Sequence, residues 1–167
     1  SGLTSGADID LSAVDATDPE SGTVTVGADT ATFVEIEEVV ATDFDDTITG
    51  SDGDDSIDMG EGADTIDAGE GDDEINLGDQ DGDADVVTLE NGDGDDTLTG
   101  VDGPVPNPDG SFTPVDTLDV TGLTDPTTGD PVTTDDVTIT TDPVTGTVIT
   151  FPDGTSVTLP ELQAPGT

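Results

Sequence analysis

The stretch "GSDGDDSIDMGEGADTIDAGEGDDEIN", residues 50–76, repeats its own pattern every nine residues. An aspartate recurs at this period, and an isoleucine follows each aspartate by two positions. The coupled pairs are Asp46 and Ile48, Asp55 and Ile57, Asp64 and Ile66, and Asp73 and Ile75. A fixed nine-residue period is typical of a solenoid, in which each repeat is one structural unit.

Downstream the repeat continues in a looser form. The pattern recurs at Asp85 and Val87 after an insertion of three residues, and at Asp96 and Leu98 after a further two, so six units lie between residues 41 and 100. In each unit, glycines permit a tight turn and the next three residues form a short strand with one inward apolar side chain. One such strand buries almost nothing, whereas stacked copies bury a continuous apolar column. The pattern therefore predicts an all-β solenoid over residues 42–100.

The flanking segments carry different patterns. Residues 1–41 contain short apolar alternations, which predict strands that extend or cap the stack. Residues 101–115 hold four prolines and are expected to form a loop. In residues 116–167 the alternation is longer and turn signals separate the strands, with a hairpin expected over residues 147–159. We expect this last segment to form a C-terminal antiparallel β-element with open sheet edges.

The charge of the chain is extreme. It has 42 acidic residues and no Lys, Arg or His, so its formal net charge is −42. No salt bridge can form between side chains, and the repulsion between carboxylates opposes compaction. Disorder, a very saline environment or recruited metal cations could each accommodate this charge, but only metal binding accounts for the nine-residue period of the acids. The absence of bases argues against nucleic acid and anionic membranes as partners, and no apolar run is long enough to span a bilayer.

The acids are densest where glycine is densest. Glycine turns present backbone carbonyls and aspartates present short carboxylates, which are the hard oxygen ligands that Ca²⁺ takes in sets of about six to eight. Because the chain has no His or Cys, zinc, copper and iron are poor candidates. Magnesium demands a stricter octahedral geometry. The composition therefore predicts several bound calcium ions.

The segments "GEGADTID" and "GEGDDEIN" resemble the calcium-binding nonapeptide repeat of the RTX (repeats-in-toxin) family, also called hemolysin-type, whose pattern is G-G-x-G-x-D-x-U-x. The match begins at the second glycine, since Met59 and Ala68 stand in the first position. "EEVVATDFDDTITGSDGDD" is similar to the lead-in that precedes such repeats. The resemblance covers roughly a third of the chain. It implies a right-handed parallel β-roll, in which turns two units apart stack and hold calcium between them.

The resemblance also implies a set of calcium ligands. The repeat aspartates to which it points are Asp46, Asp55, Asp64, Asp73, Asp85 and Asp96. Stacking with a step of two units would pair each aspartate with the next but one. The carbonyl groups implied as further ligands belong to Gly53, Gly62, Gly71 and Gly94. The third-position acids Asp52, Glu61, Glu70 and Asp93 could add ligands or could form a solvated surface.

The insertion before Asp85 contains a second pattern. "DQDGDADVVTLE", residues 79–90, has acids at positions 1, 3, 5, 7 and 12, as an EF-hand calcium loop does. Ala84 stands where that loop requires glycine, and no flanking helices are expected. The other interpretation is a distorted repeat unit. In both, Asp81, Asp83 or Asp85 can bind calcium.

Enzymatic activity is not expected, because the chain lacks His, Cys and Lys for acid–base or nucleophilic work. Two functions remain. One is a secreted structural protein that calcium folds outside the cell and that self-associates into a filament, surface layer or matrix. The other is a calcium-triggered folding and export module of a larger type I-secreted exoprotein. A start at Ser1 fits either a processed chain or a fragment.

Overall fold

The computed structural model describes residues 5–12, 21–26, 29–34, 38–78, 83–102, 105–106, 112–113, 116–142 and 146–160. Every regular element in these ranges is a β-strand, so the expectation of an all-β protein is confirmed. Among the described residues there is no helix with the length and apolar character needed to cross a membrane.

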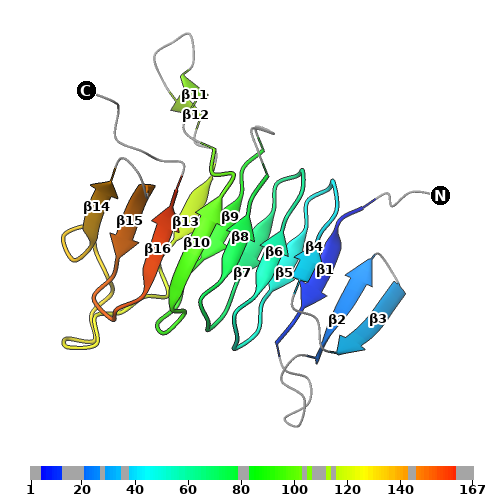
Figure 1. Ribbon diagram of the computed structural model, residues 1–167, viewed down its shortest axis with the longest axis horizontal. Coiled ribbons are helices and arrows are strands. Elements are labelled where there is room, and N and C mark those ends of the chain that lie inside the picture. Colours follow the sequence, from blue (N-terminus) through cyan, green and yellow to red (C-terminus); the bar gives the residue numbers. More distant parts are fainter. Residues whose placement is uncertain are drawn as a thin grey trace.

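The strands are short in the centre of the chain and longer at its two ends (Figure 1). Their bounds are β1 (Ala7–Asp10), β2 (Ser21–Val26), β3 (Asp29–Val34), β4 (Glu38–Val40), β5 (Thr47–Thr49), β6 (Ser56–Asp58), β7 (Thr65–Asp67), β8 (Glu74–Asn76), β9 (Val86–Thr88), β10 (Asp95–Thr99), β11 (Val105–Pro106), β12 (Phe112–Thr113), β13 (Thr117–Asp119), β14 (Thr138–Asp142), β15 (Gly146–Thr150) and β16 (Ser156–Leu159).

Strands β4 to β10 alternate between two seven-stranded sheets. One sheet has the order β13-β9-β7-β5-β1-β2-β3, and the other has the order β14-β15-β16-β10-β8-β6-β4. Within each sheet these central strands pair in parallel, with Ile48 opposite Ile66 and Ile57 opposite Ile75. Partners are thus two nine-residue units apart, as the sequence predicts for stacked units.

Antiparallel strands complete both sheets, which are therefore mixed rather than purely parallel. At one end β1 pairs in parallel with β5 and antiparallel with β2, and β2 pairs antiparallel with β3. At the other end β14, β15 and β16 form an antiparallel meander, and β16 pairs in parallel with β10. The hairpin expected over residues 147–159 is therefore present. The segment 101–115, expected as a loop, contains the antiparallel pair β11–β12, which projects from the stack (Figure 1).

The core lies between the two sheets. The isoleucines of the repeat are almost completely buried, at 2% exposure or less. A second buried column comes from the position just after β6, β7, β8 and β9, where Met59, Ala68, Leu77 and Leu89 lie. Two of these, Met59 and Ala68, replace the first glycine of the RTX pattern. An apolar side chain at this position adds to a core that the three-residue strands alone would leave small.

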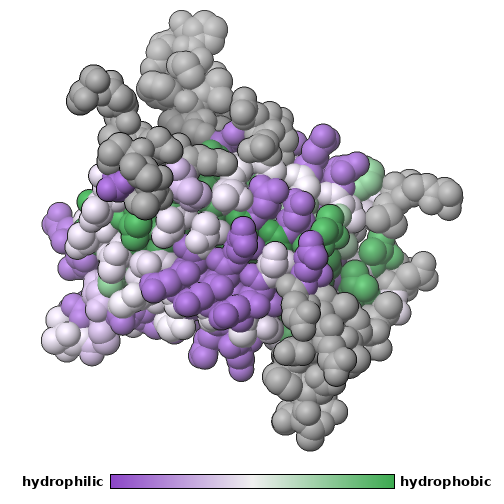
Figure 2. Space-filling model, in the orientation of Figure 1, coloured by the Kyte–Doolittle hydropathy of each residue, from purple (hydrophilic) through white to green (hydrophobic). Residues whose placement is uncertain are grey.

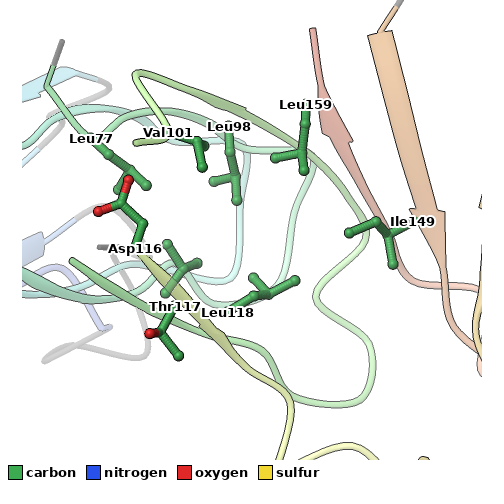
Figure 3. Close-up of a pocket in the computed structure, with 9 residues that line it drawn as sticks. Leu77, Leu98, Val101, Asp116, Thr117, Leu118, Ile149 and Leu159 are labelled. Carbon is green, nitrogen blue, oxygen red and sulfur yellow. The ribbon is translucent and has the colours of Figure 1, made fainter. Parts of the chain in front are cut away.

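The core is less completely filled near the last strands of the stack. A pocket of about 130 Å³ lies there between the two sheets. Most of its lining is apolar, including Leu77, Leu98, Leu118, Ile149 and Leu159, and it also includes Asp116 and Thr117 (Figure 3). On the face shown in Figure 2, hydrophilic residues gather over the middle of the stack, across its lower row of turns. This face of the repeat region is thus strongly polar, while the isoleucines of its strands are buried.

Candidate metal centre

Two rows of turns run along the stack, one on each edge, and connect the two sheets (Figure 1). We call the turns that lead into β5, β7 and β9 the first row, and those that lead into β6, β8 and β10 the second row. Each turn ends at a repeat aspartate. The three turns of the first row end at Asp46, Asp64 and Asp85, and the three turns of the second row end at Asp55, Asp73 and Asp96.

Glycines allow each turn to pack directly on the turn two units before it. Gly69 has a φ of 90°, and a Cβ atom added there would lie 2.1 Å from the carbonyl oxygen of Ser51. In the first row, a Cβ atom on Gly60 would lie 2.2 Å from the carbonyl oxygen of Thr42. Only glycine tolerates both this conformation and this approach. Backbone oxygens of neighbouring turns therefore crowd together along both rows.

The repeat aspartates form a hydrogen-bonded ladder along each row. In the first row, the N–H of Asp46 donates to Oδ1 of Asp64 at 2.7 Å, and the N–H of Asp64 donates to Oδ1 of Asp85 at 2.9 Å. The second row repeats this arrangement. There the N–H of Asp55 donates to Asp73 at 2.8 Å and that of Asp73 to Asp96 at 3.1 Å. All six of these aspartates are buried, so the structure brings together every pair that a two-unit step predicts.

Three of these carboxylates each have an oxygen atom with no hydrogen-bond partner in the described structure. Oδ2 of Asp64, Asp73 and Asp96 is buried, while the side chains themselves are 2% exposed or less. Burial raises the pKa of each of these three carboxyl groups to about 7, and neighbouring acids add to the effect. An ionised carboxylate that is removed from water and left unpaired is strongly disfavoured unless a cation lies beside it. The chain has no basic side chain to supply that cation.

Comparison with known families identifies the repeat. The family model described as the RTX calcium-binding nonapeptide repeat (4 copies) matches residues 36–66 and 60–84. Residues 36–84 contain RTX calcium-binding nonapeptide repeats. No curated protein sequence and no solved structure matches the chain. Because RTX nonapeptide repeats bind Ca²⁺, several calcium ions are the cofactor of this region.

The turns offer only oxygen atoms as metal ligands, and calcium binds through oxygen. Among the described residues, no three Asp or Glu side chains converge closely enough to form a metal site by themselves. Calcium accepts carboxylate and backbone carbonyl oxygens together. An ion in an RTX turn row would therefore combine an unpaired aspartate oxygen with carbonyl oxygens of the packed turns.

The third-position acids of the RTX repeats separate into two groups. Asp52, Glu61 and Glu70 are exposed, whereas Asp93 is only 4% exposed. Oδ2 of Asp93 accepts a hydrogen bond from the N–H of Glu90. Burial raises the pKa of the Asp93 carboxyl to about 6. The sequence showed these four positions as equivalent, and only the structure separates Asp93 from the rest.

The candidate carbonyl ligands differ in their surroundings. The N–H of Ser156 donates to the carbonyl oxygen of Gly94 at 2.8 Å. The hydroxyl of Ser51 lies 3.4 Å from the carbonyl oxygen of Gly53. Gly62 and Gly71 adopt φ values of 129° and 136°. These two glycines pack with their Cα atoms against the backbone at Phe44 and at Gly53. At both glycines the backbones of neighbouring turns are therefore in direct contact.

The insertion before Asp85 retains the geometry of a repeat unit where it is described. Asp81 lies outside the described residues, and Asp83 is exposed. Asp85 is buried within the first-row ladder, and β9 pairs in parallel with β7. The described part of this segment therefore matches the interpretation as a distorted repeat unit.

The first-row ladder extends to a residue that the sequence interpretation missed. The N–H of Asp85 donates to Oδ1 of Asp116 at 3.2 Å, and β13 pairs in parallel with β9. The signal was present, because Asp116 and Leu118 repeat the spacing of Asp96 and Leu98. It was hidden because the proline-rich segment separates the two, so the nine-residue period does not reach Asp116.

Proposed function

We propose that this chain is a secreted structural protein that calcium folds outside the cell into a right-handed parallel β-roll with an antiparallel cap. The observation that carries the proposal is the set of buried, unpaired oxygen atoms on Asp64, Asp73 and Asp96 in a chain without basic residues. Calcium ions take the place of the missing bases. In this proposal residues 42–100 are the calcium-binding roll, residues 1–41 and 116–167 cap it, and 101–115 is a connecting excursion.

The proposed ligands are those expected from the repeat. Repeat aspartates supply carboxylate oxygens, and turn glycines supply carbonyl oxygens. Asp93 is the third-position acid best placed to contribute, since it is buried. We propose that Asp52, Glu61 and Glu70, which are exposed, contribute mainly by attracting cations to the surface. Asp81 and Asp83 remain candidate ligands in the insertion.

Calcium concentration provides the reason for an extracellular setting. A ligand that binds only the folded state stabilises it by RT ln(1 + [L]/Kd), so stability depends on the free calcium concentration. With calcium scarce inside the cell and abundant outside, the chain would stay unfolded during export and fold afterwards. The RTX repeats support this proposal.

Open sheet edges support self-association. β14 is the last strand of its sheet, and all five of its residues are exposed. Ile139 on this strand and Val40 on the opposite edge strand β4 are each 66% exposed. Unpaired edge strands with exposed apolar side chains are templates for pairing with another chain. We therefore propose that copies join through these edges. The alternative, a folding and export module of a larger exoprotein, shares the calcium chemistry but needs no such contact.

Calcium dependence is tested by titrating the far-UV circular dichroism of the chelated protein with calcium. We expect coil without calcium and β-sheet with it. Replacing Asp64 and Asp73 together with Ala should raise the calcium midpoint. The matched control replaces the exposed Asp130 and Asp135, which changes the net charge equally and should leave the midpoint unchanged. An equal midpoint for both double variants would refute the ligand assignment.

Self-association is tested separately by light scattering at high protein concentration, with calcium and then with chelator. The structural-subunit proposal expects particles larger than a monomer in calcium that disperse on chelation. A variant with Ile139→Asp should scatter as a smaller particle while retaining its calcium-induced dichroism. A strictly monomeric calcium-loaded protein would exclude the structural-subunit version and leave the export module.

A further inference from the structure

Five repeat turns that the structure describes throughout belong to two classes, which differ at the residue four positions before the repeat aspartate. In the first turn of each row this residue carries a hydroxyl group: Thr42 stands before Asp46, and Ser51 stands before Asp55. In the turns whose aspartates have an unpaired oxygen it is a glycine. These glycines are Gly60, Gly69 and Gly92, before Asp64, Asp73 and Asp96.

The hydroxyl residues pair with the carboxylate oxygen that is unpaired in the other class. Thr42 donates to Oδ2 of Asp46 from its N–H at 2.7 Å and from its hydroxyl at 2.9 Å. Ser51 donates to Oδ2 of Asp55 from its N–H at 2.8 Å and from its hydroxyl at 3.0 Å. Two donors from one residue thus surround each of these oxygens.

The glycine turns do not provide this pair of donors. Gly60, Gly69 and Gly92 have φ values of 88°, 90° and 102°, in the left-handed region that favours glycine. They have no hydroxyl group, and Oδ2 of the aspartate that follows each of them has no hydrogen-bond partner in the described structure. These three oxygens are buried and remain available to a cation.

We propose that, in these five turns, the residue four positions before the repeat aspartate selects whether the turn takes calcium. At Asp46 and Asp55, the hydrogen-bond donors of Thr42 and Ser51 lie against the oxygen to which calcium would bind, so these two aspartates are not calcium ligands. At the aspartates that follow a glycine, the same oxygen is unpaired and binds calcium. These are Asp64, Asp73 and Asp96. This inference rests on the proposed calcium-binding function. It narrows the ligand set given by the repeat pattern and makes the N-terminal turn of each row independent of the metal.

The test counts calcium ions bound per full-length chain by equilibrium dialysis at neutral pH. Asp55→Asn keeps an oxygen that can accept from Ser51 and should leave the number of ions unchanged. Asp73→Asn, the equivalent change in the next turn of the same row, should lose at least one ion. A loss for Asp55→Asn as large as that for Asp73→Asn would overturn the proposal. A parent chain that binds no calcium would overturn the proposed function itself.

A variant that should gain an ion keeps the proposal testable if Asp73→Asn fails to fold. Ser51→Gly turns residues 50–55 into Gly-Gly-Asp-Gly-Asp-Asp, the full repeat pattern. We expect this variant to bind one ion more than the parent and to need more calcium to reach full sheet content. Ser51→Thr is the matched control, because it keeps a hydroxyl and should leave the count unchanged. An unchanged count in Ser51→Gly would overturn the role of residue 51.

Discussion

At the scale of single residues, the protein depends on carboxyl groups placed where water does not reach them. The pKa of Asp64, Asp73 and Asp96 is raised to about 7 by burial, so the folded chain holds these protons more tightly than the unfolded chain does. Without metal, the corresponding stability is present below about pH 4 and is lost as the pH rises through about 7. Protons and calcium thus act as alternative partners for the same oxygens.

This predicts opposite pH effects with and without calcium. In chelator, the sheet signal in circular dichroism should increase when the pH is lowered from about 8 to about 5. In calcium, the same change should raise the calcium midpoint, because protons compete with the metal for the carboxylates. A variant with Asn at all three positions should lose most of the effect in chelator. A dichroism signal that does not change with pH in chelator would contradict the prediction.

The close stacking of the turns also requires glycine at particular positions. Gly69→Ala places a side chain in the left-handed region and within 2.1 Å of the Ser51 carbonyl oxygen. The conformation alone costs about 1–2 kcal/mol, and the contact forces the turns apart in addition. Gly129→Ala is the control, since Gly129 has a φ of 77° but no atom within 4 Å of the added Cβ atom.

Urea unfolding in saturating calcium measures the free energy of unfolding of both glycine variants. We expect the cost for Gly69→Ala to exceed that for Gly129→Ala clearly. Equal costs would mean that the turns do not need their close stacking.

At the scale of elements, strands of three residues are stable only as members of a stack. Each central strand contributes one buried apolar residue, and its partners lie two units away along the chain. The residue just after the strand adds a second buried side chain, as Met59 and Leu77 show. At β6 to β9 the core therefore gains a second apolar position in each unit, where the repeat pattern alone indicated one.

Replacing a core isoleucine should affect the whole stack. Ile66→Ala removes a side chain with 0% exposure in β7, and we expect a loss of about 2–5 kcal/mol in the free energy of unfolding in calcium. Thr65→Ala, at an exposed position of the same strand, should change it by no more than about 0.5 kcal/mol. Urea unfolding followed by circular dichroism measures both. Similar losses for the two variants would contradict the core assignment.

At the scale of the whole molecule, the net charge of −42 opposes folding in two ways. Surface carboxylates repel each other through solvent, where salt screens them. In addition, Oδ2 of Asp64, Asp73 and Asp96 is buried without a hydrogen-bond partner in the described structure, and screening does not supply one. A saline setting can relieve the first problem only. Calcium ions bound at the buried acids, which recur every nine residues, would supply the partner that these oxygens lack.

Sodium chloride should therefore not substitute for calcium. At molar sodium chloride with chelator the Debye length falls to about 3 Å, yet Oδ2 of the three central aspartates still has no ligand. We expect a coil-like dichroism spectrum under these conditions and a sheet spectrum in millimolar calcium. Magnesium at matched ionic strength should shift the spectrum less than calcium does. A sheet spectrum in sodium chloride with chelator would show that screening alone is sufficient.

The sequence alone determined the period, the chemistry and most of the stacking partners. Because aspartate, glycine and isoleucine recur together every nine residues, the short strands, the buried isoleucines and the pairing of Asp55 with Asp73 could all be predicted. Where the period is broken, the stacking partner could not be predicted. The insertion before Asp116 concealed the continuation of the first-row ladder.

Only the tertiary structure decided which acids are buried and which of their oxygens are paired. Asp46 and Asp64 occupy the same repeat position, yet Thr42 satisfies Oδ2 of the first while that of the second is left unpaired. Likewise, Asp93 is buried although Glu61 is exposed. The physical reason is that hydrogen bonding depends on the backbone conformation of each turn and on contacts between units far apart in the chain. Having the same residue at the same repeat position does not specify either of these.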